Sequence, residues 1–426
     1  MLSRDRVTSV SYNRPYRPAP VTLFNAVGQR LERVGVRPDL SVNSLLQAAC
    51  RAERADTFAD LSFVEPLRVL LDSVEQEARL SPLGRLVTRA RLIGLLRNRL
   101  RAETLLEQHP EIAQAPLPPI VLITGLQRTG TTLLHRLLAA DPDNRSLLSW
   151  EAINPLPPTR PRQRDRRERL ARTSCRVLTF LAPDFFAIHP VEHDAPEEDV
   201  LLLDYALLST VPESTLHVPS YSRWVEAQDH RPAYEYMARL LQILQWQRPG
   251  KRWILKSPHH LEFLDAFLAV FTNVVVVQTH RDPTTTIASF SSMIAHGRGI
   301  FSDSVDPHGI GASLLRKTAR MVSRGLATRR NAPHDQFVDV YYDELVRDPI
   351  RQIERIYERC GIVLGDRARA AMQRSLDVNV QYRYGRHRYG LDHFGLSERM
   401  IREHFGEYYR AFGLGQCRAA SADLLR

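Results

Sequence analysis

One short segment, in which an apolar strand, a glycine-bounded turn and a helix follow each other, constrains the fold most. Residues 120–124 form a β-branched, aliphatic run of the kind that is buried in parallel sheets. Gly125 and Gly130 bound a turn, and residues 131–140 have the composition of a helix. Backbone N–H groups converge at such a turn, and the helix dipole adds partial positive charge. The segment therefore predicts a phosphate-binding loop.

The alternation of strands and helices continues along the chain and predicts the fold class. Apolar runs typical of buried strands recur at residues 253–255, 274–277 and 337–341, and a helical pattern covers residues 260–271. Strands that alternate with helices form parallel sheets covered on both faces. We therefore predict an α/β fold in which a parallel sheet is flanked by helices.

The rest of the chain divides into regions by its hydrophobic pattern. Residues 1–20 show little periodic hydrophobicity and are interpreted as a flexible lead-in. Apolar residues recur at helical spacing over residues 21–116, a helical N-terminal region that ends in a proline cluster. Residues 117–426 are assigned to the α/β domain, with a helical insertion at about residues 158–250.

The composition is that of a soluble globular enzyme. Hydrophobic residues make up 43% of the 426 residues, no uncharged run approaches the length of a membrane span, and the first residues do not form an export signal. The four cysteines form no CxxC pair, so they do not suggest a zinc site. These features predict a cytoplasmic protein without a membrane span and without a metal.

The charge is strongly positive and comes almost entirely from arginine. The formal net charge of +10 and the pI near 9.7 favour anionic partners, but do not choose among nucleic acid, an acidic membrane and a polyanionic cofactor. Among the 58 basic residues only Lys251, Lys256 and Lys317 are lysines. The arginine-dense run at residues 160–176 contains acidic residues and lacks aromatics for base stacking, so we interpret it as a solvated helix face.

The loop differs from that of nucleotide triphosphatases at one position. The spacing of Gly125 and Gly130 fits the pattern GxxxxGK, but Thr131 stands where the lysine belongs. Without that lysine the β- and γ-phosphates of ATP lose their main cation, whereas Arg128 places a guanidinium inside the loop. The residues predicted to bind an anionic group are therefore Arg128, Thr129, Gly130, Thr131 and Thr132.

Five segments, taken in order, carry a family resemblance: Gln127 to Thr132, Leu255 to His259, Gln278 to Pro283 with Ser289, Tyr341 to Leu345, and Asp392 to Ser397. They resemble the PAPS-dependent sulfotransferases, particularly their broad bacterial branch, over roughly residues 117–412. The resemblance implies a P-loop-like sulfotransferase fold. It also implies a sulfuryl donor, 3′-phosphoadenosine-5′-phosphosulfate (PAPS), whose 5′-phosphosulfate lies on the loop.

The resemblance further implies roles for residues beyond the loop. In the family, an arginine and a serine eight residues apart hold the 3′-phosphate of the nucleotide, and Arg281 and Ser289 keep that interval. Tyr342 matches the family's tyrosine on the adenine side. Independently of the family, Asp282 and Pro283 predict the N-cap and first turn of a helix that runs through Ser289.

Sulfuryl transfer requires in-line geometry, cations near the leaving phosphate and a base for the acceptor proton. Arg128 and Lys256 are the candidates for stabilising the leaving group. Two residues compete as the base. Glu151 is favoured because related branches keep a glutamate in a similar place, and His259 is second because it lies three residues after Lys256, where the cytosolic branch has its histidine two residues after its lysine. Further candidates are His260, His280 and Glu197.

The predicted function is transfer of a sulfuryl group from PAPS to a hydroxyl or amine acceptor, with release of 3′-phosphoadenosine-5′-phosphate (PAP). One alternative is a P-loop small-molecule kinase or nucleotide hydrolase, which needs the missing loop lysine and Mg²⁺ ligands. The other is a basic nucleic-acid-binding protein, although no nucleic-acid partner is expected. The acceptor class, whether small molecule, glycan or lipid, and the oligomeric state are not encoded in any recognisable pattern.

Two polar segments have no assigned role at this level. Residues 189–199 mix histidines and carboxylates, but their spacing fits no metal-ligand template and favours an acceptor loop or a polar surface. Residues 386–388, Arg-His-Arg, are placed to reach either the 3′-phosphate or the acceptor.

Overall fold

A five-stranded sheet forms the centre of the protein, which we describe from a computed structural model for residues 12, 15–158, 164–183, 192–378 and 390–414. All neighbouring strands are parallel, in the order β2-β3-β1-β4-β5. The strands are β1 (Ile120–Gly125), β2 (Asn144–Ser146), β3 (Arg252–Lys256), β4 (Val274–His280) and β5 (Phe337–Tyr341). The predicted α/β fold with a parallel sheet is confirmed.

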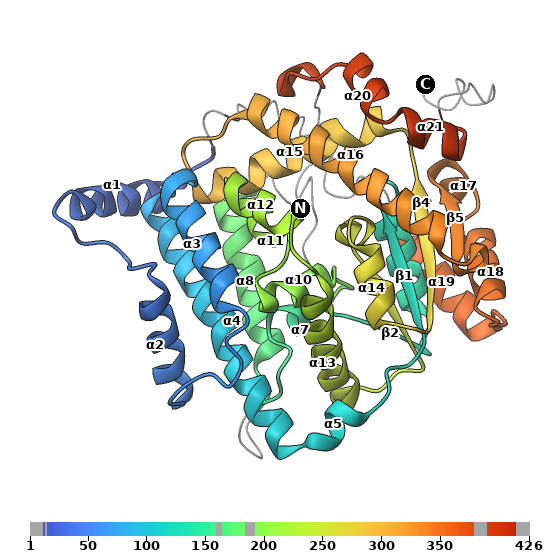
Figure 1. Cartoon of the computed structure of the whole chain (residues 1–426), viewed down its shortest axis with the longest axis horizontal. Helices are drawn as coiled ribbons and strands as arrows, with labels where there is room; N and C mark the ends of the chain where they lie inside the picture. The colour runs from blue at the N-terminus through green and yellow to red at the C-terminus, as the bar shows by residue number, and fades with distance from the viewer. Residues whose placement is uncertain (1–11, 13–14, 159–163, 184–191, 379–389, 415–426) are drawn as a thin grey trace.

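Five helices precede β1 along the described residues 15–119: Figure 1 shows four of them on the left side, where α1 projects from the body, and α5 at the bottom. They are α1 (Ala19–Arg33), α2 (Val42–Glu53), α3 (Val64–Glu77), α4 (Pro82–Gln108) and α5 (Pro110–Gln114). The helical pattern predicted for residues 21–116 is confirmed. Most of the predicted lead-in lies outside the described residues, so its flexibility stays a prediction.

The segment between β2 and β3 is helical, as predicted for the insertion. Its elements are α7 (Ser149–Ile153), α8 (Arg167–Leu181), α10 (Val200–Leu203), η1 (Asp204–Ala206), α11 (Val211–Thr215), α12 (Pro219–Glu226) and α13 (Arg231–Gln247). Apolar residues of α10 and α13 share one core with those of α3 and α4. The insertion and the N-terminal helices therefore pack together. The predicted division of the chain into separate regions stays a prediction.

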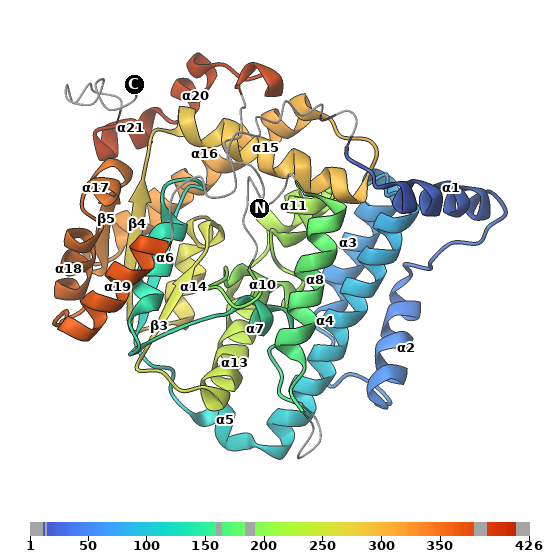
Figure 2. The same ribbon diagram turned by 180° about the vertical axis from the view of Figure 1, so that it is seen from behind.

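Helices after the strands complete the architecture. They are α6 (Thr131–Ala140), η2 (Pro258–Leu261), α14 (Leu264–Val270), α15 (Pro283–Phe301), α16 (Pro307–Asn331), η3 (His334–Gln336), α17 (Tyr342–Arg347), α18 (Pro349–Arg359), α19 (Asp366–Val378), η4 (Asp392–Phe394), α20 (Glu398–His404) and α21 (Gly406–Phe412). Both views show the sheet between α17, α18 and α19 on one side and α13 and α14 on the other (Figures 1 and 2).

Alternate residues of the central strand β1 are buried in two separate cores. Ile120 and Leu122 belong to the core built with the N-terminal helices and the insertion, whereas Val121 and Ile123 belong to the core built with α6, α18 and α19. This is the burial expected of a central parallel strand, whose faces are both covered. Burial on both faces explains why the sequence of β1 is a continuous apolar run.

Two details of the sheet differ from the sequence-based prediction. Strand β2 was not predicted, because its three residues at the sheet edge are polar and carry no apolar run. The helix predicted over residues 260–271 is divided into η2 and α14 by a break at Glu262 and Phe263. No helix in the described part of the chain is long and apolar enough to cross a bilayer.

Candidate active site

The predicted site residues gather where parallel strands end. Ile123 of β1 pairs with Lys256 of β3, so the loop that follows β1 and the segment that follows β3 lie at the same edge of the sheet. Two hydrogen bonds join these ends: Ser257 N donates to the Ile123 carbonyl at 3.2 Å, and Thr124 Oγ1 donates to the Ser257 carbonyl at 3.1 Å. The carboxyl ends of parallel strands are the usual place for ligands in open α/β sheets.

Glycine is required at both ends of the loop. Gly125 has φ of 136°, and a Cβ there would lie 2.5 Å from the Thr279 carbonyl oxygen of β4. Gly130 has φ of 91° and forms the N-cap of α6, where a Cβ would lie 2.9 Å from Leu345 Cδ2. Residues other than glycine rarely adopt such positive φ angles. Arg128, between the two glycines, is an exception, with φ of 68°. The loop is therefore a tightly specified turn.

The three loop threonines have different surroundings. Thr129 is fully buried, and its hydroxyl lies 2.6 Å from both the Leu126 carbonyl oxygen and Thr279 Oγ1. That hydroxyl fastens the loop to β4, which leaves the backbone N–H of Thr129 as its candidate contact with a ligand. Thr131 is buried and Thr132 exposed at the first two positions of α6, where backbone N–H groups lack intrahelical partners.

Arg281, which follows β4, contacts the loop directly. Its Nη1 donates to the carbonyl oxygen of Arg128 at 3.1 Å, and its guanidinium lies 3.8 Å from the ring centroid of Tyr342. Tyr342 in turn packs against the loop, since its Cδ2 would be 3.2 Å from a Cβ on Gly130. The structure thus brings together four residues that the sequence analysis assigned to one nucleotide.

Ser289 lies two turns into α15, whose N-cap is Asp282 with Pro283 in the first turn, as predicted. Only 2% of Ser289 is exposed, and among the described residues its hydroxyl has no hydrogen-bond partner. A buried hydroxyl without a partner is costly. Its chemistry therefore fits a serine that donates to an anion, and PAPS would supply one in its 3′-phosphate.

Lys256 is buried at the end of β3 and its ammonium is paired. Nζ lies 2.6 Å from Oε1 of Glu198, and Oε2 of the same carboxylate lies 3.4 Å from Ser257 Oγ. The sequence analysis gave Glu198 no role. Its only local signal is the acidic run Glu197 to Asp199, which precedes an apolar helix.

Glu151 is held in a buried ion-pair network. Both oxygens accept hydrogen bonds from the guanidinium groups of Arg145 and Arg248, and Oε2 also accepts from Leu148 N at 3.0 Å, which caps α7. Burial alone raises the pKa of Glu151, but the charges and hydrogen bonds of the two arginines outweigh it and lower the pKa below its usual value. Its assignment as the base stays a prediction, and its contacts are those of a structural anchor.

His259, the second candidate base, is buried with its ring beside Phe263, at 4.9 Å between centroids. Neither ring nitrogen has a partner among the described residues. Burial lowers the pKa of His259 well below its usual value, and the charges of His230 and His260 act in the same direction. The imidazole is therefore neutral at neutral pH, which permits proton acceptance but makes it a weak base.

The remaining candidate bases make structural contacts. His260 lies between Tyr234 and Asp199, with Nδ1 2.9 Å from the tyrosine hydroxyl and Nε2 2.8 Å from Oδ1 of the aspartate. His280 lies in the same way between Tyr408 and Asp339. Glu197 accepts a hydrogen bond from Ser149 at 3.2 Å. Each of these side chains makes a contact between segments that are distant in the chain, and the candidacy of each as the base stays a prediction.

Comparison with known proteins decides the family. A profile of the sulfotransferase family matches residues 119–366, more than half of the chain. The chain belongs to the sulfotransferase family. Two curated relatives from Mycobacterium bovis and Mycobacterium tuberculosis, both named omega-hydroxy-beta-dihydromenaquinone-9 sulfotransferase Stf3, are 23% identical over 263 residues. That match covers 58% of this chain and only 63% of the length of each relative.

Solved structures of sulfotransferases share the fold over nearly their whole length. Sulfotransferase STF1 from Mycobacterium tuberculosis is 34% identical, with a TM-score of 0.72 and coverage of 86% of this chain and 98% of its own. Sulfotransferase STF9 from Mycobacterium avium is 26% identical, with a TM-score of 0.79 and coverage of 88% and 98%. The similarity therefore extends well beyond the sheet, over most of the chain.

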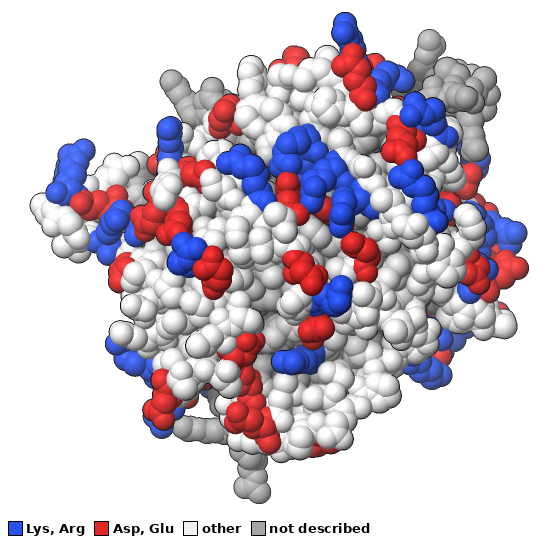
Figure 3. Space-filling view, in the orientation of Figure 1, with Lys and Arg blue, Asp and Glu red and all other residues white. Residues whose placement is uncertain are grey.

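Charge on the visible face of this sulfotransferase is mixed rather than uniformly basic. Figure 3 shows basic groups close to acidic ones, with basic side chains gathered near α15 and α16. On α16, Arg316 and Arg320 pair with Glu226, and Arg324 pairs with Asp265. Part of the arginine excess is thus neutralised by neighbouring carboxylates.

The polar segments without a predicted role are only partly described. In the arginine-dense run, Arg167 pairs with Asp165 and Arg172 with Glu168 on α8. Residues 386–388 and 189–191 lie outside the described residues. Within the described ranges, no three His, Cys, Asp or Glu side chains are placed to hold a metal ion.

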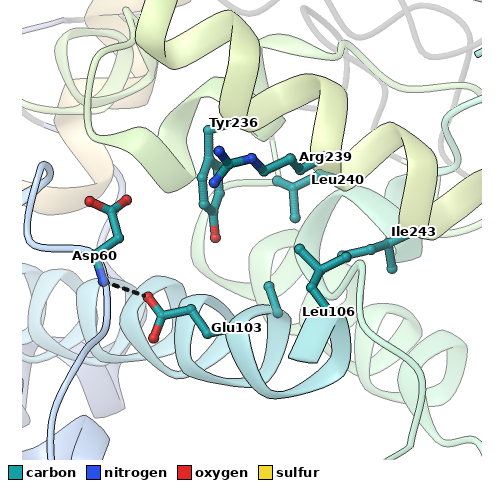
Figure 4. Close-up of a pocket in the computed structure, with 8 residues that line it drawn as sticks. Asp60, Glu103, Leu106, Tyr236, Arg239, Leu240 and Ile243 are labelled. Atoms are coloured by element: carbon teal, nitrogen blue, oxygen red, sulfur yellow. Dashed lines mark hydrogen bonds between the residues drawn. The ribbon is translucent and has the colours of Figure 1, made fainter. Parts of the chain in front are cut away.

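A cavity of about 40 Å³ lies between α4 and α13, away from the sheet edge (Figure 4). Tyr236 and Arg239 line it from α13, and Glu103, which accepts a hydrogen bond from the backbone of Asp60, lines it from α4. Its volume is far below that of a nucleotide site, which needs several hundred Å³ or more. No predicted site residue lines this cavity.

Proposed function

We propose that this chain transfers a sulfuryl group from PAPS to a hydroxyl acceptor and releases PAP. The observation that carries the proposal is the contact of Arg281 with both the loop carbonyl of Arg128 and the ring of Tyr342. One nucleotide with two separate anionic groups explains why these residues lie together, since each group then has its own cations and donors.

Each part of PAPS has a matching set of residues in this proposal. The loop from Arg128 to Thr132 and the first turn of α6 bind the 5′-phosphosulfate through backbone N–H groups. Arg281 and Ser289 bind the 3′-phosphate, and the aromatic face of Tyr342 lies beside the adenine. Support comes from the glycine-dependent turn and from the buried hydroxyl of Ser289.

The chemical step requires positioning and charge rather than a metal. Lys256 and Arg128 are proposed to stabilise the negative charge that develops on the leaving phosphate, as positioned cations do in phosphoryl transfer. Lys256 suits this role because it is buried at the sheet edge next to the loop, where a charge acts more strongly than in water.

For the acceptor we propose a hydroxylated, lipid-like small molecule. The support is indirect: the curated relatives are named for a hydroxylated menaquinone derivative. A glycan or a small polar alcohol is the alternative that the acceptor assay has to decide. The protein is proposed to act in the cytoplasm, as expected from its sequence.

A P-loop kinase or hydrolase is the strongest rival function. It would need a cation for the β- and γ-phosphates at the position of Thr131, and that side chain is a buried threonine at the start of α6. In the proposal, the cations for smaller anionic groups come instead from Arg128 in the loop and from Arg281, which contacts the loop carbonyl of Arg128. The rival therefore has less support from the loop.

Calorimetric titration with PAP, and separately with ATP and Mg²⁺, tests the donor. We expect saturable binding of PAP and at least tenfold weaker binding of the ATP complex. PAPS is then incubated with para-cresol, para-nitrophenol, a disaccharide and a long-chain prenyl alcohol in detergent micelles, and sulfated product is measured by mass spectrometry. Preferential binding of Mg-ATP, or no PAP binding, would contradict the proposal.

A further inference from the structure

Glu198 is a carboxylate at the sheet edge to which the sequence analysis gave no role. It immediately precedes Asp199 and α10 in the insertion, yet its side chain reaches the end of β3. Oε1 lies 2.6 Å from Lys256 Nζ and Oε2 lies 3.4 Å from Ser257 Oγ. The carboxylate therefore contacts two consecutive residues at the point where β3 ends.

This contact places Glu198 beside the phosphate-binding loop. Lys256 is paired in the sheet with Ile123, two residues before Gly125, and Ser257 is hydrogen-bonded to the same strand. A group that touches Lys256 and Ser257 thus lies at the edge where the transferred group of PAPS would be bound.

The two acidic residues next to Glu198 in the sequence make other contacts. Asp199 holds His260 at 2.8 Å, and Glu197 accepts from Ser149. His135 of α6 also feels the charge of Lys256. Burial together with that charge lowers the pKa of His135 well below its usual value, so its imidazole is neutral at neutral pH. Of the three consecutive acidic residues, Glu198 is the one directed at the lysine.

Glu198 also differs from the two predicted bases in its access to water. Its side chain is 26% exposed, whereas that of Glu151 is 2% exposed between two arginines, and His259 is buried. A base must meet the acceptor and must afterwards release its proton to solvent. Glu198 meets the second condition in this structure, because part of its carboxylate is open to water, and its position beside Lys256 is the argument for the first.

We propose that Glu198 is the general base of the reaction. In the step, a bond forms between the acceptor oxygen and sulfur while the bond from sulfur to the bridging phosphate oxygen breaks. The hydroxyl proton passes to the Glu198 carboxylate, which later releases it to water, and PAP leaves with the electron pair. Lys256 has three N–H donors, so one can stay with Glu198 while another meets the leaving oxygen. This inference rests on the proposed function.

The decisive variant is Glu198→Gln, which keeps a hydrogen-bond acceptor for Lys256 but cannot take a proton. Glu111→Gln is the matched control, because it makes the same change at an exposed carboxylate on α5, outside the segments assigned to the site. With PAPS and para-cresol we expect Glu198→Gln to lower kcat by about 10²- to 10⁴-fold, the range of general-base catalysis. The Kd for PAP is expected to change by less than about threefold, and Glu111→Gln is expected to match wild type.

A second acceptor separates a base from a residue that merely positions Lys256. Para-nitrophenol is largely ionised at mildly alkaline pH and needs no base, so the loss in Glu198→Gln should shrink by about tenfold or more with it. Equal losses with both phenols, or wild-type rates in the variant, overturn the inference.

If wild type sulfates the prenyl alcohol but neither phenol, the test is the pH dependence of kcat/KM measured with the prenyl alcohol. The decrease of kcat/KM on the acid side is then expected in wild type and absent in Glu198→Gln, and its persistence in the variant overturns the inference. A wild type that binds no PAP and sulfates no acceptor contradicts the proposed function instead.

Discussion

Glu151 and Glu198 are both glutamates of the segment between β2 and β3, but their surroundings differ. Glu151 accepts five hydrogen bonds from Arg145, Arg248 and the backbone of Leu148, and it is almost completely buried. Glu198 is partly hydrated and contacts Lys256 and Ser257. The first arrangement stabilises the fold around β2 and α7, and the second places a carboxylate next to a cation of the site.

The comparison teaches that the distance of a residue from a motif in sequence does not establish its chemistry. Glu151 was favoured because it follows the loop at a family-like interval. Its partner Arg145 is buried deeply enough that its own pKa falls to about 10 despite the nearby carboxylate. Because burying the charge of Arg145 is costly, Arg145 needs a permanent negative partner. Glu151 is that partner, so it is poorly suited to gain and lose a proton during turnover.

The largest expected effect is on stability. Glu151→Ala leaves Arg145 buried without its main counter-charge, so we expect the free energy of unfolding to fall by about 3–5 kcal/mol, measured by urea denaturation. Glu198→Gln keeps an acceptor for Lys256 and should lower it by only about 1 kcal/mol. If the two variants are equally stable, the contrast between a structural and a functional carboxylate is broken.

The next effect is on turnover. Arg128→Ala and Lys256→Ala are each expected to reduce kcat by about 10²- to 10³-fold, the loss seen when one donor to a developing negative charge is removed. Lys251→Ala is the control, because Lys251 precedes the other end of β3 and is exposed. Thermal unfolding should show that all three variants fold. Wild-type rates in Arg128→Ala and Lys256→Ala would remove both residues from the mechanism.

A smaller effect is expected on nucleotide affinity. Arg281→Ala removes a charge-assisted contact and should weaken PAP binding by about 1.5–3 kcal/mol, which is roughly tenfold to 150-fold in Kd. Calorimetry measures the change, with Arg324→Ala, an exposed arginine paired with Asp265, as the control. An unchanged Kd in Arg281→Ala would mean that the 3′-phosphate is bound elsewhere.

The smallest effect extends the comparison to the buried histidines. Burial lowers the pKa of His230 from its usual value near 6.5 to about 4, so the unfolded chain takes up a proton before the folded protein does. Its contribution to stability is therefore complete above about pH 6.5 and is lost as the pH falls towards about 4.

For His230 alone the loss between about pH 6.5 and pH 5 is on the order of 1.5 kcal/mol. Denaturation at the two pH values measures it, and His230→Gln should flatten the dependence relative to wild type. A stability that is independent of pH in this range would show that His230 is not held neutral by burial.

Local sequence was sufficient for the central part of the fold. Strand β1, the turn bounded by Gly125 and Gly130, and helix α6 were predicted because each depends on residues that are adjacent in the chain. The N-cap at Asp282 was predicted for the same reason. These features follow from burial on both sheet faces and from backbone angles that only glycine adopts readily.

Contacts between distant segments could not be predicted in the same way. Glu198 reaches Lys256 across 58 positions of the chain, and Glu151 meets Arg248 across 97. Both contacts depend on how the insertion folds against β3, which no local periodicity encodes. Strand β2 was missed because an edge strand of three polar residues owes its conformation to pairing with β3.

The burial of Lys256 and Lys317 has a practical consequence for labelling the protein. With only three lysines in the sequence, Lys251, whose side chain is 70% exposed, is the one open to amine-reactive reagents, apart from the terminal amine. A fluorophore coupled there would sit at the amino end of β3, opposite the loop. Such a conjugate would carry its fluorophore at one lysine, away from the carboxyl ends of the strands, where sulfuryl transfer is proposed to occur.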